Sequence, residues 1–166
     1  MKAKLIVEGK EFDIDILDPE LQKLLKPEKK TGYECNGFGH TYFFVNNYGE
    51  IKIVDHIDSD DDNRYEAANY YSDKTVAENN ARADKLMRQL RRFAVEHREN
   101  KIEWCNHKAN SFIFYNRVTD KLEVAGNDAY QAFGIVYFDS KKTAELAIEE
   151  FKDELLWYFT EYKDSL

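Results

Sequence analysis

The chain has 166 residues, of which 43% are hydrophobic and 14% aromatic, and its formal net charge is −8. This composition is typical of a folded protein that can bury a core, and it excludes an intrinsically disordered chain. The negative charge argues against broad binding to phosphate backbones, because nucleic-acid affinity comes mostly from basic surfaces. No apolar run approaches the roughly 20 residues that span a bilayer, and with only two cysteines we expect a protein of a reducing cytoplasm.

The N-terminal residues alternate apolar and polar side chains around Gly9. Segments 2–8 and 11–17 therefore predict a β-hairpin. Asp18 and Pro19 then supply an N-cap and a first-turn proline for a short helix, ELQKLLK. We treat residues 1–30 as an N-terminal element within a single compact unit.

The rest of the chain contains an internal repeat. The motif YYSDKTVAE at 70–78 returns as YFDSKKTAE at 137–145, and a predicted hairpin at 41–54 matches another at 111–125. Each hairpin is followed by a polar loop, an aromatic pair and a helix with one apolar stripe. We predict an α+β fold with two hairpin-strand-helix repeats, 31–100 and 101–166, that form one antiparallel sheet with both helices on one face.

The repeated motif marks a joint between a strand and a helix. Its aromatic pair is typical of a strand end, and the Ser and Asp residues that follow are good helix caps. Ala77 and Ala144 come one turn into each helix, where a small side chain allows close approach to the sheet. We expect these two alanines to occupy equivalent buried positions.

The segment between the first hairpin and its aromatic pair, DHIDSDDDNRYEAAN, is strongly acidic. Its D-x-D-x-D spacing resembles the start of a calcium loop, but Asn63 stands where that loop needs glycine and Asn69 where it needs glutamate. We therefore predict a solvated loop without a metal. Its candidate role is binding to a partner protein through four aspartates: Asp58, Asp60, Asp61 and Asp62.

A second candidate set combines cysteine and histidine: Cys35, His40, Cys105 and His107. Thiolate and imidazole are the ligands that zinc prefers, but the C-x4-H and C-x-H spacings differ from the usual ligand pairs. We predict neither a metal site nor a cofactor here. Whether the four side chains meet in space is left open by the sequence.

The helix predicted downstream of residue 74 carries a basic stretch, RADKLMRQLRRFAVEHR. One interpretation is that its cations pair with the chain's own carboxylates. The alternative is an anion or nucleotide pocket, in which arginines hold a phosphate and tyrosines stack on a base. The candidate residues for that pocket are Tyr65, Tyr70, Arg88, Arg91 and Arg92.

Catalytic signatures are absent from the sequence. It contains no G-x-S-x-G, P-loop, H-E-x-x-H or glycine-rich dinucleotide motif, which favours a protein that is not an enzyme. Aromatic residues are numerous, especially Trp157, Tyr158, Phe159 and Tyr162 near the C-terminus. Because one sheet face and two helix stripes do not suffice to bury all of them, we expect a homodimer that uses the C-terminal helix or the open sheet face.

Three long segments carry a resemblance to known sequences: 1–34, 68–100 and 133–166. Together they resemble a group of uncharacterised proteins from phages and prophages of Gram-positive (Firmicutes) bacteria. The resemblance implies no catalytic residues; it implies a small accessory phage product in a bacterial cytoplasm.

Three functional hypotheses follow from this setting. The first is a non-enzymatic inhibitor of a host defence component, whose acidic surface occupies a basic partner site such as that of a nucleic-acid-binding protein. The second is a sponge that sequesters a nucleotide immune signal. The third is a structural or assembly protein of the phage particle.

Overall fold

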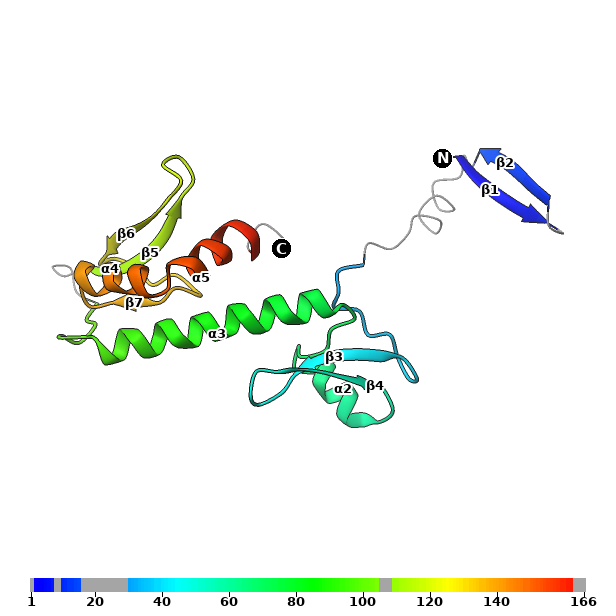
Figure 1. The fold of residues 1–166 in the computed structure, drawn as a ribbon, viewed down its shortest axis with the longest axis horizontal. Helices are drawn as coiled ribbons and strands as arrows, with labels where there is room; N and C mark the ends of the chain where they lie inside the picture. The colour runs from blue at the N-terminus through cyan, green and yellow to red at the C-terminus, as the bar shows by residue number, and fades with distance from the viewer. Residues whose placement is uncertain (1, 8–9, 16–29, 105–108, 163–166) are drawn as a thin grey trace.

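The structure is a computed structural model that describes residues 2–7, 10–15, 30–104 and 109–162 (Figure 1). It contains helices and antiparallel sheets, so the predicted α+β class is confirmed. At the N-terminus, β1 (Lys2–Val7) and β2 (Lys10–Asp15) form the expected antiparallel hairpin. The short helix predicted after this hairpin lies outside the described residues.

The first unit is built on a second hairpin. Strands β3 (Thr41–Val45) and β4 (Ile51–Asp55) pair antiparallel, and helix α2 (Ser59–Glu66) follows them. Tyr71 then exchanges backbone hydrogen bonds of 2.8 and 2.9 Å with Phe43, so a third extended segment lies beside β3. The long helix α3 (Lys74–Glu96) begins directly after it.

The second unit repeats this order. Strands β5 (Asn110–Asn116), β6 (Lys121–Asn127) and β7 (Tyr137–Phe138) form a sheet in the order β6-β5-β7. Helix α4 (Lys141–Glu150) follows β7, and α5 (Lys152–Trp157) and the short π-helix η1 (Tyr158–Tyr162) complete the described chain.

The two units therefore share one topology: in each, the third extended segment pairs antiparallel with the first strand of the hairpin, and a helix follows. Their register differs. The equivalent residues of the third segments are Tyr71 and Phe138. Tyr71 pairs with Phe43, three residues before the turn residue Asn46, whereas Phe138 pairs with Ser111, five residues before the turn residue Asn116. Because side chains alternate with a period of two, this shift leaves each side chain on its original face.

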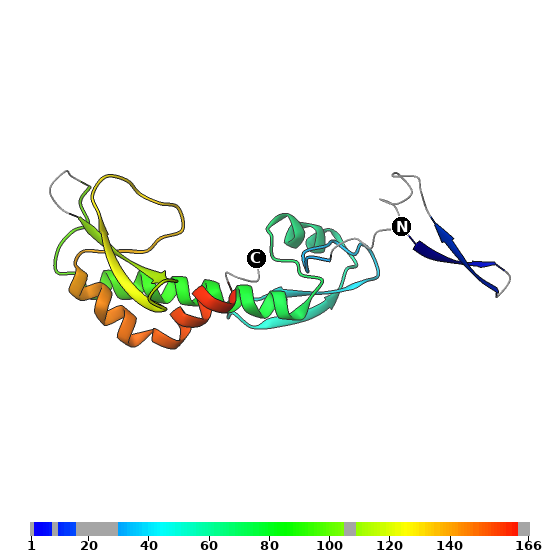
Figure 2. The ribbon, with the colours of Figure 1, turned by 90° about the horizontal axis from the view of Figure 1, so that it is seen from above.

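The prediction of one continuous sheet is wrong, because the two hairpins belong to separate sheets. The reason lies in α3. Its buried residue Ala77 and its buried residue Leu86 are nine positions apart, which places them about 180° apart around the helix. Figure 1 shows the two units on opposite sides of α3, and Figure 2 shows them toward its opposite ends. A single sheet cannot contact both sides of one helix.

The main hydrophobic core lies between the second half of α3 and the second unit. Its buried members are Leu86, Leu90, Ala94, Phe138, Ala144, Ala147 and Leu155. The predicted equivalence of the two repeat alanines is confirmed in burial, since Ala77 and Ala144 are both fully buried.

The aromatic residues near the C-terminus contact the rest of the chain. The Arg82 guanidinium lies 3.9 Å over the buried Trp157 ring, and the Tyr162 hydroxyl donates a hydrogen bond of 2.9 Å to Asn80. Phe159 stacks on Tyr115. These contacts remove much of the argument for an interface on the last helix, and self-association stays a prediction.

Candidate partner-binding surface

The acidic segment that was predicted to be a loop forms helix α2 in the structure. Asp58 is its N-cap, and its side chain accepts a hydrogen bond of 2.9 Å from the backbone of Asp60. Asp61 returns the interaction by accepting from the backbone N–H of Asp58, which completes a capping box. Three aspartates in the first turn also lie at the positive end of the helix dipole. Capping and charge thus form a helix that has little apolar periodicity.

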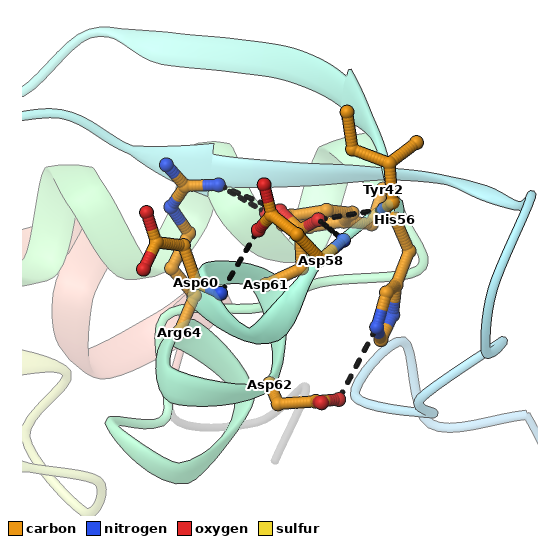
Figure 3. A network of polar contacts seen from close by, with 8 residues as sticks. Tyr42, His56, Asp58, Asp60, Asp61, Asp62 and Arg64 are labelled. Atoms are coloured by element: carbon orange, nitrogen blue, oxygen red, sulfur yellow. Dashed lines mark hydrogen bonds and ion pairs between the residues drawn. The ribbon is translucent and has the colours of Figure 1, made fainter.

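Asp61 points inward, and it is only 3% exposed (Figure 3). Its Oδ1 accepts hydrogen bonds from the Tyr42 hydroxyl at 2.5 Å and from Arg64 at 2.8 Å, and its Oδ2 accepts from the backbone N–H of Ile57 at 2.7 Å. Arg64 also donates to the Tyr42 hydroxyl at 2.6 Å. The Asp61 charge is therefore neutralised inside the first unit, and Asp61 does not belong to the exposed acidic patch predicted for it.

This network shifts the pKa values of Asp61 and Tyr42 away from neutrality, in opposite directions. The hydrogen bond from Tyr42 lowers the pKa of Asp61 to about 2, with help from the backbone N–H groups and Arg64 and against the effect of burial. Burial, reinforced by the hydrogen bond to Asp61, raises the pKa of Tyr42 to about 12. Across the physiological range Asp61 stays ionised and Tyr42 stays protonated.

Aromatic rings complete the interior beneath α2. Tyr42 stacks on Tyr70 with ring centroids 3.9 Å apart and planes at 7°, and Tyr65 packs edge-on against Tyr70. The Arg64 guanidinium lies 4.3 Å over Phe44. Tyr70 is almost fully buried by these contacts. It therefore serves as a core residue, in contrast to the base-stacking role considered for it.

His56 is a buried polar residue of this region that the sequence pattern did not reveal. Its Nε2 lies 3.2 Å from a carboxylate oxygen of the exposed Asp62. Within the described part of the chain, its Nδ1 has no hydrogen-bond partner. The contact ties Asp62 to the end of β4 and fixes the direction in which α2 presents its outer side.

The exposed surface of α2 is acidic and partly apolar, with Asp60 and Asp62 on opposite flanks of the inward-pointing Asp61, about 200° apart around the helix axis. Between Glu50 and Glu66 the chain has seven acidic and two basic side chains, which carry five of its eight net negative charges. Large apolar side chains lie at both ends of the helix: Ile57 is 63% exposed and Tyr65 is 46% exposed. We call this surface the acidic face, and its members are Ile57, Asp58, Asp60, Asp62 and Tyr65.

The alternative nucleotide pocket is not assembled from the residues predicted for it. Tyr70 is buried, and Arg92 lies 3.9 Å from its helical neighbour Glu96. Arg88 lines a hollow beside Asp84 and the turn of the first hairpin, whereas Arg91 lines a different one. Positions 88, 91 and 92 share one side of α3, because residues three and four apart are neighbours on a helix. Their surroundings nevertheless differ, since Arg88 and Arg91 line separate hollows and Arg92 lies beside Glu96.

The cysteine and histidine set is only partly described. Cys35 is an exposed free cysteine, and Cys105 and His107 lie outside the described residues. Among residues 30–104 and 109–162, no three histidine, cysteine or acidic side chains are grouped in a way that could hold a metal ion. None of the helices described is long and apolar enough to cross a membrane.

Comparisons with protein-family models, with curated proteins and with solved structures each found no match to this chain.

Proposed function

We propose that this chain is a non-enzymatic binding protein whose acidic face occupies a basic surface of a partner protein. The observation that carries the proposal is that the aspartates of α2 and its N-cap have two different roles. Asp61 is turned inward and paired with Tyr42 and Arg64, while Asp58, Asp60 and Asp62 are exposed. The internal network fixes the helix, and the exposed carboxylates are then held in a defined arrangement.

Such an arrangement favours association with a cationic surface. Complementary charge increases the rate of encounter and selects against wrong partners, more than it adds to final affinity. Binding also costs less entropy when the contact side chains are already held by a capped and packed helix. The exposed Ile57 and Tyr65 provide apolar contacts near the two ends of α2, where a partner can exclude water.

The partner that fits this chemistry is a nucleic-acid-binding protein. Its binding surface presents lysine and arginine side chains placed to neutralise phosphates, and the exposed carboxylates of α2 compete for the same cations. The resemblance to phage proteins supports a setting in the cytoplasm of an infected bacterium. There the partner would be a component of host defence, and occupation of its nucleic-acid site would inhibit it.

The chemistry of the buried cluster supports binding over catalysis. A general acid or base works best with a pKa close to the working pH. The pKa of Asp61, at about 2, and that of Tyr42, at about 12, lie far from neutrality in opposite directions. This cluster is therefore suited to holding α2 in place and poorly suited to proton transfer.

The proposal is tested by reversing charge on the acidic face. Asp60 and Asp62 are both changed to lysine, and association with a partner isolated from the bacterial host is measured by surface plasmon resonance at low and high salt. The matched control changes Glu149 and Glu150 of α4, which are also exposed, to lysine. Both double variants alter the net charge equally, so long-range charge effects are the same.

We expect the variant of the acidic face to lower the association rate by about 10-fold or more at low salt, with a smaller effect at high salt because salt screens the attraction. The control variant should associate almost like the unchanged chain. Equal losses in both variants would show that net charge alone matters and would contradict a role for α2. Thermal melting of each variant excludes loss of the fold as the cause.

A further inference from the structure

Arginine and aromatic side chains do meet in this protein, at the far end of α3. Beyond the end of that helix, the carboxylate of Asp139 accepts hydrogen bonds of 2.8 and 2.9 Å from the backbone N–H groups of Glu99 and Asn100. The chain is thereby turned back toward β7. As a result, Trp104 packs edge-on against Tyr137, with ring centroids 4.9 Å apart and planes at 86°.

This turn borders an open hollow of about 310 Å³. Arg91 of α3 and Arg98 just beyond it contribute guanidinium groups, and Trp104 and Tyr137 contribute aromatic rings. Gln131 adds an amide group from the loop that leads to β7. Trp104 is half-buried, so part of its indole is accessible from the hollow. The size is at the lower end of the range for small-molecule sites, roughly 300–1,000 Å³.

The charge distribution around the hollow is unusual for an acidic chain. Arg64, Arg82 and Arg92 each lie within 4.0 Å of a carboxylate. By contrast, Arg91 and Arg98 make neither a hydrogen bond nor an ion pair with any residue that the structure describes, and no acidic side chain lines the hollow there. The nearby Asp139 is occupied, since it accepts bonds from two backbone N–H groups and from Thr143. The site therefore offers two cations without an internal counter-ion.

From this geometry we propose that the hollow binds a mononucleotide or a closely similar aromatic anion. Guanidinium groups bind phosphate in a bidentate manner, and an indole ring offers a surface on which a base stacks. The limited volume of the open hollow, about 310 Å³, suits a single nucleotide better than a longer ligand. A polymer is disfavoured as well, because the net charge of −8 repels an extended phosphate backbone. This site is separate from the acidic face and does not depend on the function proposed for it.

Calorimetry of the nucleotide-free full chain against three probes tests the proposal: adenosine 5′-monophosphate, adenosine and inorganic phosphate. We expect the nucleotide to bind measurably and both fragments to bind at least about 10-fold more weakly, because each lacks one of the two contacts. Binding should also quench Trp104 fluorescence. That change should disappear in Trp104→Phe, which retains the second tryptophan, Trp157.

Arg91→Ala and Arg98→Ala should each weaken nucleotide binding by about 10-fold or more, because each removes a charge-assisted hydrogen bond. Arg92→Ala is the matched control, since it removes the same charge from the same region of α3 but lies outside the hollow. Equal weakening in the control would overturn the assignment. So would inorganic phosphate binding as tightly as the nucleotide, or no binding of any probe at millimolar concentration.

Discussion

The two units of this protein share a topology and differ in what fills their interiors. Beneath α2 the first unit buries Tyr42, Tyr70, His56 and Asp61, which are aromatic or polar. The second unit buries Phe138 and Ala144 against the aliphatic side of α3. The same three-segment frame thus accepts a polar, aromatic interior or an apolar one. In the polar interior the Tyr42 hydroxyl and the Asp61 carboxylate are hydrogen-bonded to each other.

The difference originates in the loop between the hairpin and the third segment. In the first unit this loop contains α2, whose Asp61 and Arg64 provide partners for the Tyr42 hydroxyl. In the second unit the corresponding residues, 128–136, form no helix. Tyr137, which follows them, packs against Trp104 from the segment before β5. The helix present in the first unit alone therefore accounts for both its polar network and its exposed acidic surface.

The largest effect is expected in the apolar interior. Phe138→Ala removes a fully buried ring from the main core, and the cavity that results should lower the free energy of unfolding by about 3–5 kcal/mol. Urea denaturation checks the value. Tyr48→Ala is the control, because that ring is exposed, and a loss of similar size there would contradict the assignment of the core.

The polar interior should respond next. Asp61→Ala leaves the Tyr42 hydroxyl and the Arg64 guanidinium without their carboxylate, and we expect a loss of about 3 kcal/mol in the free energy of unfolding. Asp60→Ala, one position earlier and exposed, should cost less than about 1 kcal/mol through the helix dipole. Comparable losses would mean that the buried network does not stabilise the first unit.

The lowered pKa of Asp61 also predicts how the free energy of unfolding changes at acid pH. The folded-state pKa of Asp61 is about 2, below its ordinary value of about 3.9, so its stabilising contribution is present above pH 4 and is lost as the pH falls toward 2. Asp61→Asn should therefore flatten the dependence of unfolding free energy on pH between about 4 and 2. An unchanged slope would assign the acid sensitivity to other carboxylates.

The two repeat alanines should give intermediate and similar effects. Ala77→Leu and Ala144→Leu each insert three carbon atoms at a fully buried helix–sheet contact, which we expect to cost about 1–3 kcal/mol by overpacking. Thermal melting measures both, with the exposed Ala129→Leu as a control. A clear loss at only one alanine would show that the two contacts are not equivalent.

The smallest effects are expected at the helix caps that the repeat shares. Asp73 accepts hydrogen bonds from two backbone N–H groups at the start of α3, and Ser140 accepts one at the start of α4. Asp73→Ala and Ser140→Ala should each cost about 1 kcal/mol. A negligible effect at both sites would show that packing alone sets where these helices begin.

Local features of the fold were predictable from the sequence because local chemistry determines them. The repeated YYSDKTVAE motif correctly predicts a strand-to-helix joint, and its capping residues and buried alanine take the expected roles in both units. Helix α2 was missed because its capping box and first-turn charge form it without an apolar stripe. Capping signals in an acidic segment can therefore indicate a helix that periodicity does not.

Long-range features were not predictable in the same way. The stripe that includes Leu86 and Leu90 was identified, but the sequence does not say that Ala77 contacts a different sheet. The burial of Asp61 and Tyr70 depends on segments that the fold brings together. So does the hollow that both Arg91 and Trp104 line. Contacts of this kind carry no local signature.

Helix α3 also sets the orientation of the two units relative to each other. Its 23 residues extend for about 35 Å, and the backbone rotates by about 100° around the helix axis with each residue. The number of residues between two packed positions therefore sets the angle between the elements that pack there. Insertion of a single residue between Ala77 and Leu86 would rotate one unit about the helix axis relative to the other. The acidic face would then point in a different direction from the second unit. Insertion of seven residues would restore the angle to within about 20° and move the units about 10 Å apart. The number of residues in this segment therefore determines how the acidic face and the arginine-lined hollow are directed relative to each other.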